Sequence, residues 1–324
     1  MIPETLSTGL SLPAVAAPMF LISGPDLVVE CCKNGIIGSF PALNQRDSAG
    51  FERWLLEIRE RLDHFEQSTQ RRAAPFAVNL IVHGTNPRLQ ADLELCIKHR
   101  VPLVITSLGI NADVIDSIHS YGGLVFHDVI MRRHAQKAAE AGVDGLILVS
   151  AGAGGHGGTL NPLAFVSEVR QFFDKTILLS GCLSNGQDIA TAMQMGADLA
   201  YMGTRFINTL ESLAEPDYQA TINTASTSDI VYTSAISGVS ANFLRTSLEA
   251  NGITQEMWEH KGKVDFGEEM NEARAWKTVW SAGHGVTSIN NVLSVSELIN
   301  RMHEEFDLAI KQQCSLLQRF PFNQ

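Results

Sequence analysis

Short apolar runs alternate with longer amphipathic stretches through the first two-thirds of the chain. Most of these runs are apolar on both faces, which is typical of parallel strands buried between a core and a layer of helices. Eight buried strands with helices between them indicate an α/β protein, either a closed barrel or a doubly wound sheet. The predicted strands are Ala14–Met19, Gly35–Phe40, Phe76–Leu80, Leu103–Thr106, Leu124–His127, Gly145–Ser150, Ile177–Ser180 and Leu199–Gly203.

A recurring glycine before the strands favours the barrel. Ala141–Asp144 and Met195–Asp198 each place a glycine where a helix should end, directly before a buried strand. Glycine adopts the positive φ angle that ends many helices at little cost. Asn34-Gly35 and Gly122-Gly123 stand in similar places. The repeated helix–glycine–strand unit therefore predicts a (β/α)₈ TIM barrel.

The pattern changes after Arg205. Residues 213–272 are more polar and rich in Ser, Thr and Asn, and we predict that they form a small inserted cap over the C-terminal ends of the strands. Ser296–Ile310 then has the apolar periodicity of one last amphipathic helix. The predicted division is a barrel over residues 1–212, the cap over 213–272, and a return to the barrel with a closing helix over 273–324.

Length and charge agree with this division and exclude one class of partner. The chain has 324 residues, 45% of them hydrophobic, and a (β/α)₈ barrel needs roughly 250 residues. One barrel with a small elaboration therefore fits. The formal net charge is −11 and no basic run stands out. We expect no nucleic-acid partner, because phosphate neutralisation needs clustered Lys and Arg.

Cysteine and apolar content bear on metals and location. The five cysteines are odd in number and show neither CxxC nor Cys/His ligand spacing. We therefore expect no metal site and no disulfide framework. Met1–Leu12 lacks a charged segment followed by a long apolar run, and no stretch reaches the ~18 apolar residues of a membrane helix. We expect a cytoplasmic protein with no membrane partner.

The loops after the seventh and eighth predicted strands are candidates for phosphate binding, as in many barrels. Ser180-Gly181-Cys182 follows the seventh strand, and Ser184 with Gln187 has the spacing of a capping box, which would point a helix N-terminus into this loop. Gly203-Thr204 follows the eighth strand. The glycines would let backbone amides close on an anion, whereas taken singly each is more often a turn glycine. The two loops together favour a phosphate site.

The sixth predicted strand ends in a glycine-rich segment that contains one histidine. Ser150 opens the segment, and Gly154 and Gly155 directly precede His156. So many small residues allow a flat ligand to approach the backbone. An isolated histidine is usually structural, but few nearby side chains can bury His156. A group that titrates near neutrality at a barrel mouth suits a general base or a substrate-anchoring donor.

Other strand ends carry weaker candidates. Pro18-Met19 ends the first strand, and Asn79, which ends the third, has an amide that can contact the edge of a flavin ring or merely complete the core. His127-Asp128 ends the fifth strand, where the two side chains can contact a ligand or pair with each other. Cys182 lies in the phosphate loop, but no base stands beside it in the sequence, as a nucleophilic cysteine would require.

These segments together resemble the nitronate monooxygenase family, formerly called 2-nitropropane dioxygenase. The resemblance spans nearly the whole chain in order, and its glycine-histidine and Met-Gly-Thr-Arg segments are fairly specific. The matching segments are Ala17-Pro18-Met19, Asn79, Ala153–His156, Ser180-Gly181, Met202–Arg205, Val231–Thr233, Ser237-Gly238 and Ser281–Val286.

The resemblance implies a barrel that holds FMN non-covalently, with a second small domain over the site. It implies that His156 is catalytic and that FMN contacts Pro18, Met19, Asn79, His127, Ser150, Gly154, Gly155, Ser180, Gly181, Cys182, Gly203 and Thr204. The implied partners are a small-molecule substrate, a nitronate, and molecular oxygen. The implied products are a carbonyl compound and nitrite.

Two departures from the family pattern stand near the implied cofactor. Cys182 stands where a second glycine is common, and Asp128 stands where some members have lysine. The same superfamily includes enoyl-acyl-carrier-protein reductases and NADH:quinone reductases with a similar glycine-histidine segment. An NAD(P)H-dependent flavin reductase of a quinone or enoyl thioester is therefore the alternative activity. A barrel retained only for binding is the third, and the intact phosphate loop and His156 argue against it.

Overall fold

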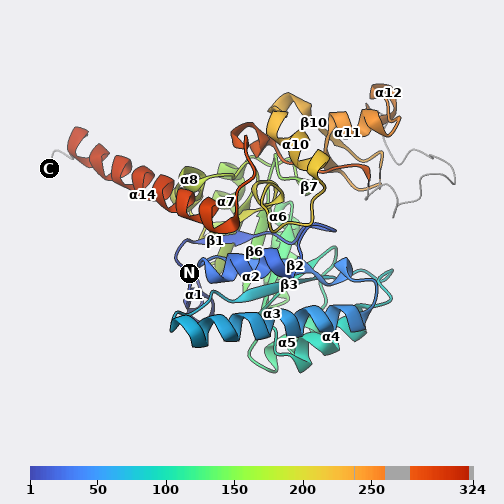
Figure 1. Ribbon diagram of the computed structural model, residues 1–324, viewed down its shortest axis with the longest axis vertical. Helices are drawn as coiled ribbons and strands as arrows, with labels where there is room; N and C mark the ends of the chain where they lie inside the picture. Colours follow the sequence, from blue (N-terminus) through green and yellow to red (C-terminus); the bar gives the residue numbers. More distant parts are fainter. Residues whose placement is uncertain (237, 260–277, 321–324) are drawn as a thin grey trace.

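Eight parallel strands close into a barrel in the computed structural model, which describes residues 1–236, 238–259 and 278–320 (Figure 1). Each barrel strand pairs with the next along the chain, and β9 pairs with β1, with Ala14 opposite Ala200. The predicted (β/α)₈ barrel is therefore confirmed. Its strands are β1 (Ala14–Ala16), β2 (Ile37–Pro41), β3 (Phe76–Ile81), β4 (Leu103–Ser107), β5 (Leu124–Val129), β6 (Gly145–Val149), β8 (Thr176–Ser180) and β9 (Leu199–Met202).

All eight predicted strands overlap these elements, because buried parallel strands read as continuous apolar runs. Their side chains alternate between the barrel interior and the helix layer. Ala77, Ile105 and Phe126 belong to the interior cluster, so residues two positions further along the same strands also face inward. On β3, β4 and β5 those positions are occupied by polar residues, which lie at the C-terminal end of the barrel interior.

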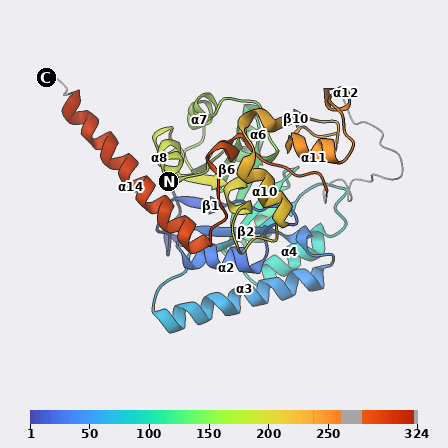
Figure 2. The same cartoon turned by 45° about the horizontal axis from the view of Figure 1, so that its top comes forward.

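Helices cover the outside of the barrel. The helix α14 (Val295–Arg319) packs against α8 and α2 and so serves as the eighth barrel helix. It contains the predicted helix Ser296–Ile310 and begins at a capping box between Ser294 and Glu297. Its C-terminal half projects away from the rest of the chain (Figure 2). The other helices between Met1 and β9 are α1 (Glu4–Ser7), α2 (Pro25–Lys33), η1 (Ala42–Asn44), α3 (Ser48–Thr69), α4 (Leu89–Lys98), α5 (Ala112–His119), α6 (Arg132–Glu140), α7 (Pro162–Arg170) and α8 (Gly186–Gln194).

A second, three-stranded antiparallel sheet stands at the C-terminal end of the barrel strands. Its strands are β10 (Ile230–Thr233), β11 (Ala241–Leu244) and β7 (Gly155–His156), in the order β10-β11-β7. Because β7 directly follows the end of β6, this pairing ties the late part of the chain to the mouth of the barrel. Around it lie α9 (Thr204–Ile207), α10 (Pro216–Thr224), η2 (Thr227–Asp229), α11 (Arg245–Ala250), α12 (Gln255–Glu259) and η3 (His284–Ser288).

The predicted division into barrel, cap and return stays a prediction. Residues 260–272 of the predicted cap, residues 273–277 and 321–324 of the predicted return, and Ser237 of the family-like segment all lie outside the described residues. No helix in the described part of the chain is both long enough and apolar enough to cross a membrane.

Candidate functional site

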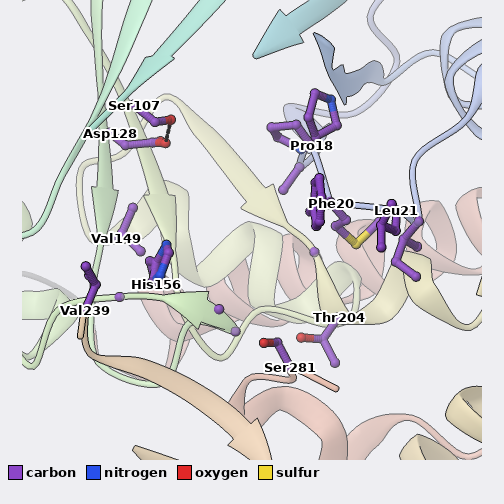
Figure 3. Close-up of a pocket in the computed structure, with 18 of the residues that line it drawn as sticks. Pro18, Phe20, Leu21, Ser107, Asp128, Val149, His156, Thr204, Val239 and Ser281 are labelled. Atoms are coloured by element: carbon purple, nitrogen blue, oxygen red, sulfur yellow. Dashed lines mark hydrogen bonds between the residues drawn. The ribbon is translucent and has the colours of Figure 1, made fainter. Parts of the chain in front are cut away.

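A cavity of about 1700 Å³ opens at the C-terminal ends of the barrel strands (Figure 3). Its walls come from the ends of β1 to β6 and of β8 and β9, from β7, and from the segments around β10, α10 and α11. This is the face on which barrel enzymes carry their active sites. Typical small-molecule pockets occupy about 300–1000 Å³, so the cavity has room for more than one ligand.

A small recess of about 20 Å³ adjoins this cavity, and six of its lining residues are glycines. We call it the glycine recess. It shares Gly154, Ser180, Tyr201, Gly203 and Thr204 with the large cavity. No Lys or Arg is among its lining residues in the part of the chain that the structure describes. Its lining consists of Gly152, Ala153, Gly154, Ser180, Gly181, Cys182, Leu183, Ser184, Tyr201, Gly203, Thr204, Gly283 and Gly285.

Two successive residues of the recess have positive φ angles, +121° at Gly181 and +59° at Cys182. The backbone N–H groups of both residues make no hydrogen bond to any other described residue. Successive N–H groups in unusual backbone conformations form concavities that bind anions. Cys182 therefore occupies a conformation that favours glycine, while its Sγ atom lies 3.7 Å from the carbonyl oxygen of Ala151.

The predicted capping box at the start of α8 is wrong by one residue. The helix begins at Gly186, and Asn185 is its N-cap, whose side chain accepts a hydrogen bond from the N–H of Asp188. Ser184 instead donates its hydroxyl proton to the carbonyl oxygen of Gly285, 3.0 Å away. An asparagine cap satisfies the same N–H groups as a serine cap, so pattern alone did not separate the two. The N-terminus of α8 still follows directly on the recess.

Close backbone contacts hold the recess open. The N–H of Gly283 donates to Thr204 Oγ1 at 3.0 Å, and the N–H of His284 donates to the carbonyl oxygen of Gly152 at 2.9 Å. A Cβ atom added to Gly154 would lie 2.9 Å from the Gly283 nitrogen. Because the Thr204 hydroxyl accepts from Gly283, its own proton is available to a ligand. These features fit a phosphate group held by N–H and hydroxyl donors rather than by a cation.

Ser150 is fully buried behind the recess and lines neither cavity. Its hydroxyl donates to the carbonyl oxygen of Ser180 at 2.5 Å, so it ties β6 to β8. A Cβ atom on Gly181 would lie only 2.5 Å from Ser150 Oγ. Ser150 therefore shapes the loop that carries Gly181 and does not reach into the site.

His156 stands on β7 with its side chain in the large cavity, as Figure 3 shows. The pairing of β7 with β11 places His156 opposite Ala241. Asn242 steadies the preceding loop by donating to the carbonyl oxygen of Ala153 at 2.6 Å. Burial lowers the pKa of His156, because the surrounding walls disfavour the charged ring. A neutral imidazole can accept a proton from a ligand near neutral pH.

Three polar side chains form the bottom of the cavity, and we call Asn79, Ser107 and Asp128 the polar floor. They come from the adjacent strands β3, β4 and β5 and face the barrel interior. Asn79 Nδ2 donates to Ser107 Oγ at 2.8 Å, and Ser107 Oγ donates to Asp128 Oδ2 at 2.5 Å. Burial raises the pKa of Asp128 to about 6, and the hydrogen bond from Ser107 offsets only part of this effect.

The remaining predicted residues, His127, Pro18 and Met19, also line the cavity. His127 is buried and its Nδ1 lies 2.8 Å from Thr106 Oγ1. Burial lowers the pKa of His127 to about 4, with a further contribution from the charge of His134, so the ring is neutral at physiological pH. Pro18 and Met19 line the cavity from the loop after β1. Apart from Ser150, every predicted site residue therefore borders the cavity or the recess.

Sequence reasoning missed several residues that border the same space. Ser107 and Tyr201 are inward-facing positions of β4 and β9, which strand alternation could have revealed. Ser281 lines the cavity near Thr204 (Figure 3), and its buried Oγ has no hydrogen-bond partner among the described residues. The segment around Gly283 resembles the family, but its position in the recess depends on the contact between Gly283 and Thr204, which are far apart in the sequence.

Comparisons with known proteins identify a matching family and several relatives. A family model described as nitronate monooxygenase matches residues 54–305. A nitronate monooxygenase of Paraburkholderia phytofirmans is 24% identical, over 94% of each chain. A 5-hydroxy-7a-methyl-1-oxo-octahydro-1H-indene-4-carboxyl-CoA dehydrogenase of Rhodococcus jostii is 23% identical, over 79% of this chain and 67% of the relative.

A solved structure shows the same fold. A nitroalkane oxidase from Streptomyces ansochromogenes matches with a TM-score of 0.77 at 22% identity, over 95% of this chain and 100% of that chain. At this level of identity, the likeness extends to the fold only.

Proposed function

The chain belongs to the nitronate monooxygenase family of oxidoreductases, and we propose that it oxidises alkyl nitronates with FMN and molecular oxygen to a carbonyl compound and nitrite. The observation that carries this proposal is the glycine recess, which adjoins a cavity containing a neutral histidine. The N–H groups of Gly181 and Cys182 and the hydroxyl of Thr204 would hold the FMN phosphate. Bound FMN would accept electrons from the substrate and pass them to oxygen.

The protein's own contribution is to place a base and to exclude water. For a neutral nitroalkane, the unprotonated ring nitrogen of His156 takes the proton from the carbon that bears the nitro group. For a nitronate, that proton is already gone, and the ring only donates a hydrogen bond or packs against the anion. The walls of the cavity limit water around the reacting atoms, which strengthens both interactions.

The direct test begins with the cofactor. We expect purified protein to be yellow and to release intact FMN on heat denaturation, because the recess suits one terminal phosphate. Release of FAD, or colourless protein that takes up no added FMN, would contradict the proposal. Anaerobic mixing with propionate 3-nitronate should then bleach the flavin, and re-admission of oxygen should restore its colour and yield nitrite.

A variant of His156 tests the assigned base. General-base catalysis contributes about 10²–10⁴-fold, whereas a hydrogen bond to a charged ligand contributes about 1.5–3 kcal/mol. We therefore expect His156→Asn to lose activity on neutral nitroalkanes and to keep part of its activity on nitronates, with FMN still bound. His134→Asn, at a second histidine on the cavity wall, is the matched control. Equal losses on both substrates would remove the base assignment.

The second candidate is an NAD(P)H-dependent flavin reductase of a quinone or enoyl thioester. Two observations favour it: the cavity of about 1700 Å³ has room for a bulky substrate, and the Rhodococcus jostii relative acts, by its name, on a carboxyl-CoA. Anaerobic mixing with NADH or NADPH separates the candidates. Flavin bleaching by the nicotinamide and not by the nitronate would favour the reductase.

A further inference from the structure

The polar floor lies at the C-terminal end of a largely apolar barrel interior. Asn79, Ser107 and Asp128 each follow an interior core residue by two positions, on three adjacent strands. The cluster that fills the barrel beneath them is hydrophobic. Buried polar groups are costly unless each atom has a partner, so the hydrogen bonds of the floor determine what it can accept.

The direction of the hydrogen bonds follows from the donors. Asn79 Nδ2 carries two protons and donates them to the carbonyl oxygen of Ile105 at 3.1 Å and to Ser107 Oγ at 2.8 Å. The single proton of Ser107 is then donated to Asp128 Oδ2 at 2.5 Å. The other carboxyl oxygen, Oδ1, is buried and has no hydrogen-bond partner among the described residues. Asp128 thus ends the series with one oxygen unsatisfied.

The surrounding groups leave Asp128 without a counter-ion in the described part of the chain. His127, its neighbour on β5, is held neutral by burial. Tyr201 on β9 has its pKa raised by burial and further by Asp128, so its phenol stays protonated. His156 on β7 and the exposed His134 and Lys137 on α6 line the same cavity, and none of them forms an ion pair with Asp128.

We propose that Asp128 is a specificity-determining residue: an anion, such as a nitronate or a carboxylate, binds in the cavity only while Asp128 holds a proton on Oδ1. An ionised carboxylate with a single donor would repel a second negative charge in the same low-dielectric space. The protonated acid removes that repulsion. A neutral ligand meets no such requirement. This inference rests on the proposed function only in taking the cavity as the substrate site.

The consequence is a pH-dependent choice between charge states. The pKa of Asp128 is raised to about 6 by burial, so the free protein loses the required proton above that pH. Binding linked to one proton weakens up to tenfold for each pH unit above the pKa of the free protein. From pH 6 to pH 8, affinity for an anion should therefore fall by up to about a hundredfold. Affinity for a neutral ligand of the same shape should stay constant.

A pair of unreactive probes tests the inference on the FMN-loaded protein. Propanoate carries a planar, anionic carboxylate group that resembles a nitronate, and propanamide is its neutral counterpart. Their Kd values are measured from pH 6 to pH 8, where propanoate stays ionised, by isothermal titration calorimetry and by the change in flavin absorbance. We expect the Kd of propanoate to rise steeply above pH 6 and that of propanamide to stay level. If propanoate binds at none of the pH values tested, the inference is overturned.

Variants isolate the contribution of Asp128. His134 also lines the cavity, so His134→Gln is measured alongside. Asp128→Asn should bind propanoate with a nearly level pH profile, while Asp116→Asn, at an exposed carboxyl on α5, should behave as wild type. Ser107→Ala removes the one donor to Asp128 and should move the midpoint to higher pH.

The outcomes separate the two proposals. An Asp128→Asn protein that retains the steep wild-type profile would overturn the role of Asp128, even if FMN is bound and nitronates are oxidised. Protein that binds no FMN would contradict the proposed function instead. If Asp128→Asn does not fold, the shift expected in Ser107→Ala decides the matter, and an unmoved midpoint there would overturn the inference.

Discussion

The glycine recess and the polar floor lie at two ends of one cavity and are built in opposite ways. The recess offers backbone N–H groups and a threonine hydroxyl, and no titratable cation lines it within the described residues. The floor offers side chains, one of which changes its charge near pH 6. A site made of backbone donors attracts an anion at every pH, whereas a site made of a buried carboxyl does so only when it is protonated.

The difference separates two tasks that one ligand site must perform. Retaining a cofactor requires an interaction that does not vary with conditions, and fixed peptide dipoles provide it. Selecting a substrate requires an interaction that distinguishes one charge state from another, and a carboxyl with an unsatisfied oxygen provides that. Changes at the two ends should therefore have different signatures: loss of cofactor at the recess, and a changed pH profile at the floor.

The largest effect is expected at Gly181, on the affinity for FMN. Gly181→Ala would place a Cβ atom 2.5 Å from Ser150 Oγ at a φ angle of +121°, so the loop must move and its N–H groups must turn away. Losing two charge-assisted hydrogen bonds of about 1.5–3 kcal/mol each should raise the Kd for FMN about a hundredfold or more. Flavin fluorescence on titration with FMN measures this.

Gly122→Ala is the matched control for Gly181→Ala. Gly122 also has a positive φ angle, but an added Cβ atom there meets nothing within 4 Å. It should cost about 1 kcal/mol of stability through backbone strain and leave FMN affinity unchanged. A Gly181→Ala protein with unaltered FMN affinity would show that the phosphate binds elsewhere.

The second effect concerns the stability of the FMN-free protein. The folded-state pKa of Asp128 is raised to about 6 from an ordinary value of 3.8, so ionisation of Asp128 disfavours the folded state as the pH rises through this window. Asp128→Asn removes that penalty. We expect the variant to be more stable than wild type at pH 8 by up to about 3 kcal/mol, and to lose this advantage below pH 4.

Urea unfolding at pH 4 and pH 8 measures that difference. A stability difference of the same size at both pH values would mean that shape, and not charge, distinguishes the variant. A difference of the opposite sign would mean that Asp128 is ionised and satisfied in the folded protein.

A smaller effect is expected at Thr204. In the wild type, the Thr204 hydroxyl accepts from the Gly283 N–H at 3.0 Å, which leaves the hydroxyl proton available to a ligand. Thr204→Val removes this hydroxyl. FMN affinity should fall about tenfold, because one hydrogen bond to a charged group is lost, with no change in its pH profile. Thr204→Ser keeps the hydroxyl and should bind FMN as wild type. An equal loss in both variants would assign the effect to packing.

The smallest effect is expected at Ser281. A substitution there should change the stability of the protein, and the sign of the change should depend on whether FMN is bound. The buried Ser281 Oγ has no hydrogen-bond partner among the described residues, so Ser281→Ala should stabilise FMN-free protein by about 1 kcal/mol. If FMN supplies the missing partner, the same change should destabilise FMN-loaded protein. Thermal unfolding with and without FMN compares the two forms. A shift of the same sign in both would show that FMN does not reach Ser281.

The recess was more predictable from the sequence than the floor, for a physical reason. Glycines at strand ends are visible locally, so Gly181 and Gly203 could be predicted to share one site, and both line the recess. The strands themselves were found because buried parallel strands are continuous apolar runs. The floor depends instead on which of two alternating faces each strand turns inward, and a shift of one residue reverses that assignment.

Particular residues show where local reasoning ended. Asn79 was selected, but Ser107, its hydrogen-bond partner from the next strand, was not. Asp128 was named as a strand-end candidate and as a departure from the family pattern, but its missing partner is a property of three-dimensional packing. Ser150 was selected as a ligand residue, yet it supports the loop from behind. The contact between Gly283 and Thr204 spans a sequence separation that no short pattern reveals.

That same contact sets an order of events during synthesis. The eighth barrel strand is complete at Met202, but the recess closes only when Gly283 donates to Thr204, and the last barrel helix starts at Val295. Domains assemble as the chain leaves the ribosome, from the N-terminus onward. A nascent chain with all eight strands thus still lacks one wall of its recess. If the recess holds FMN as proposed, cofactor capture would be one of the final steps of maturation, and chains truncated before Gly283 should bind no FMN.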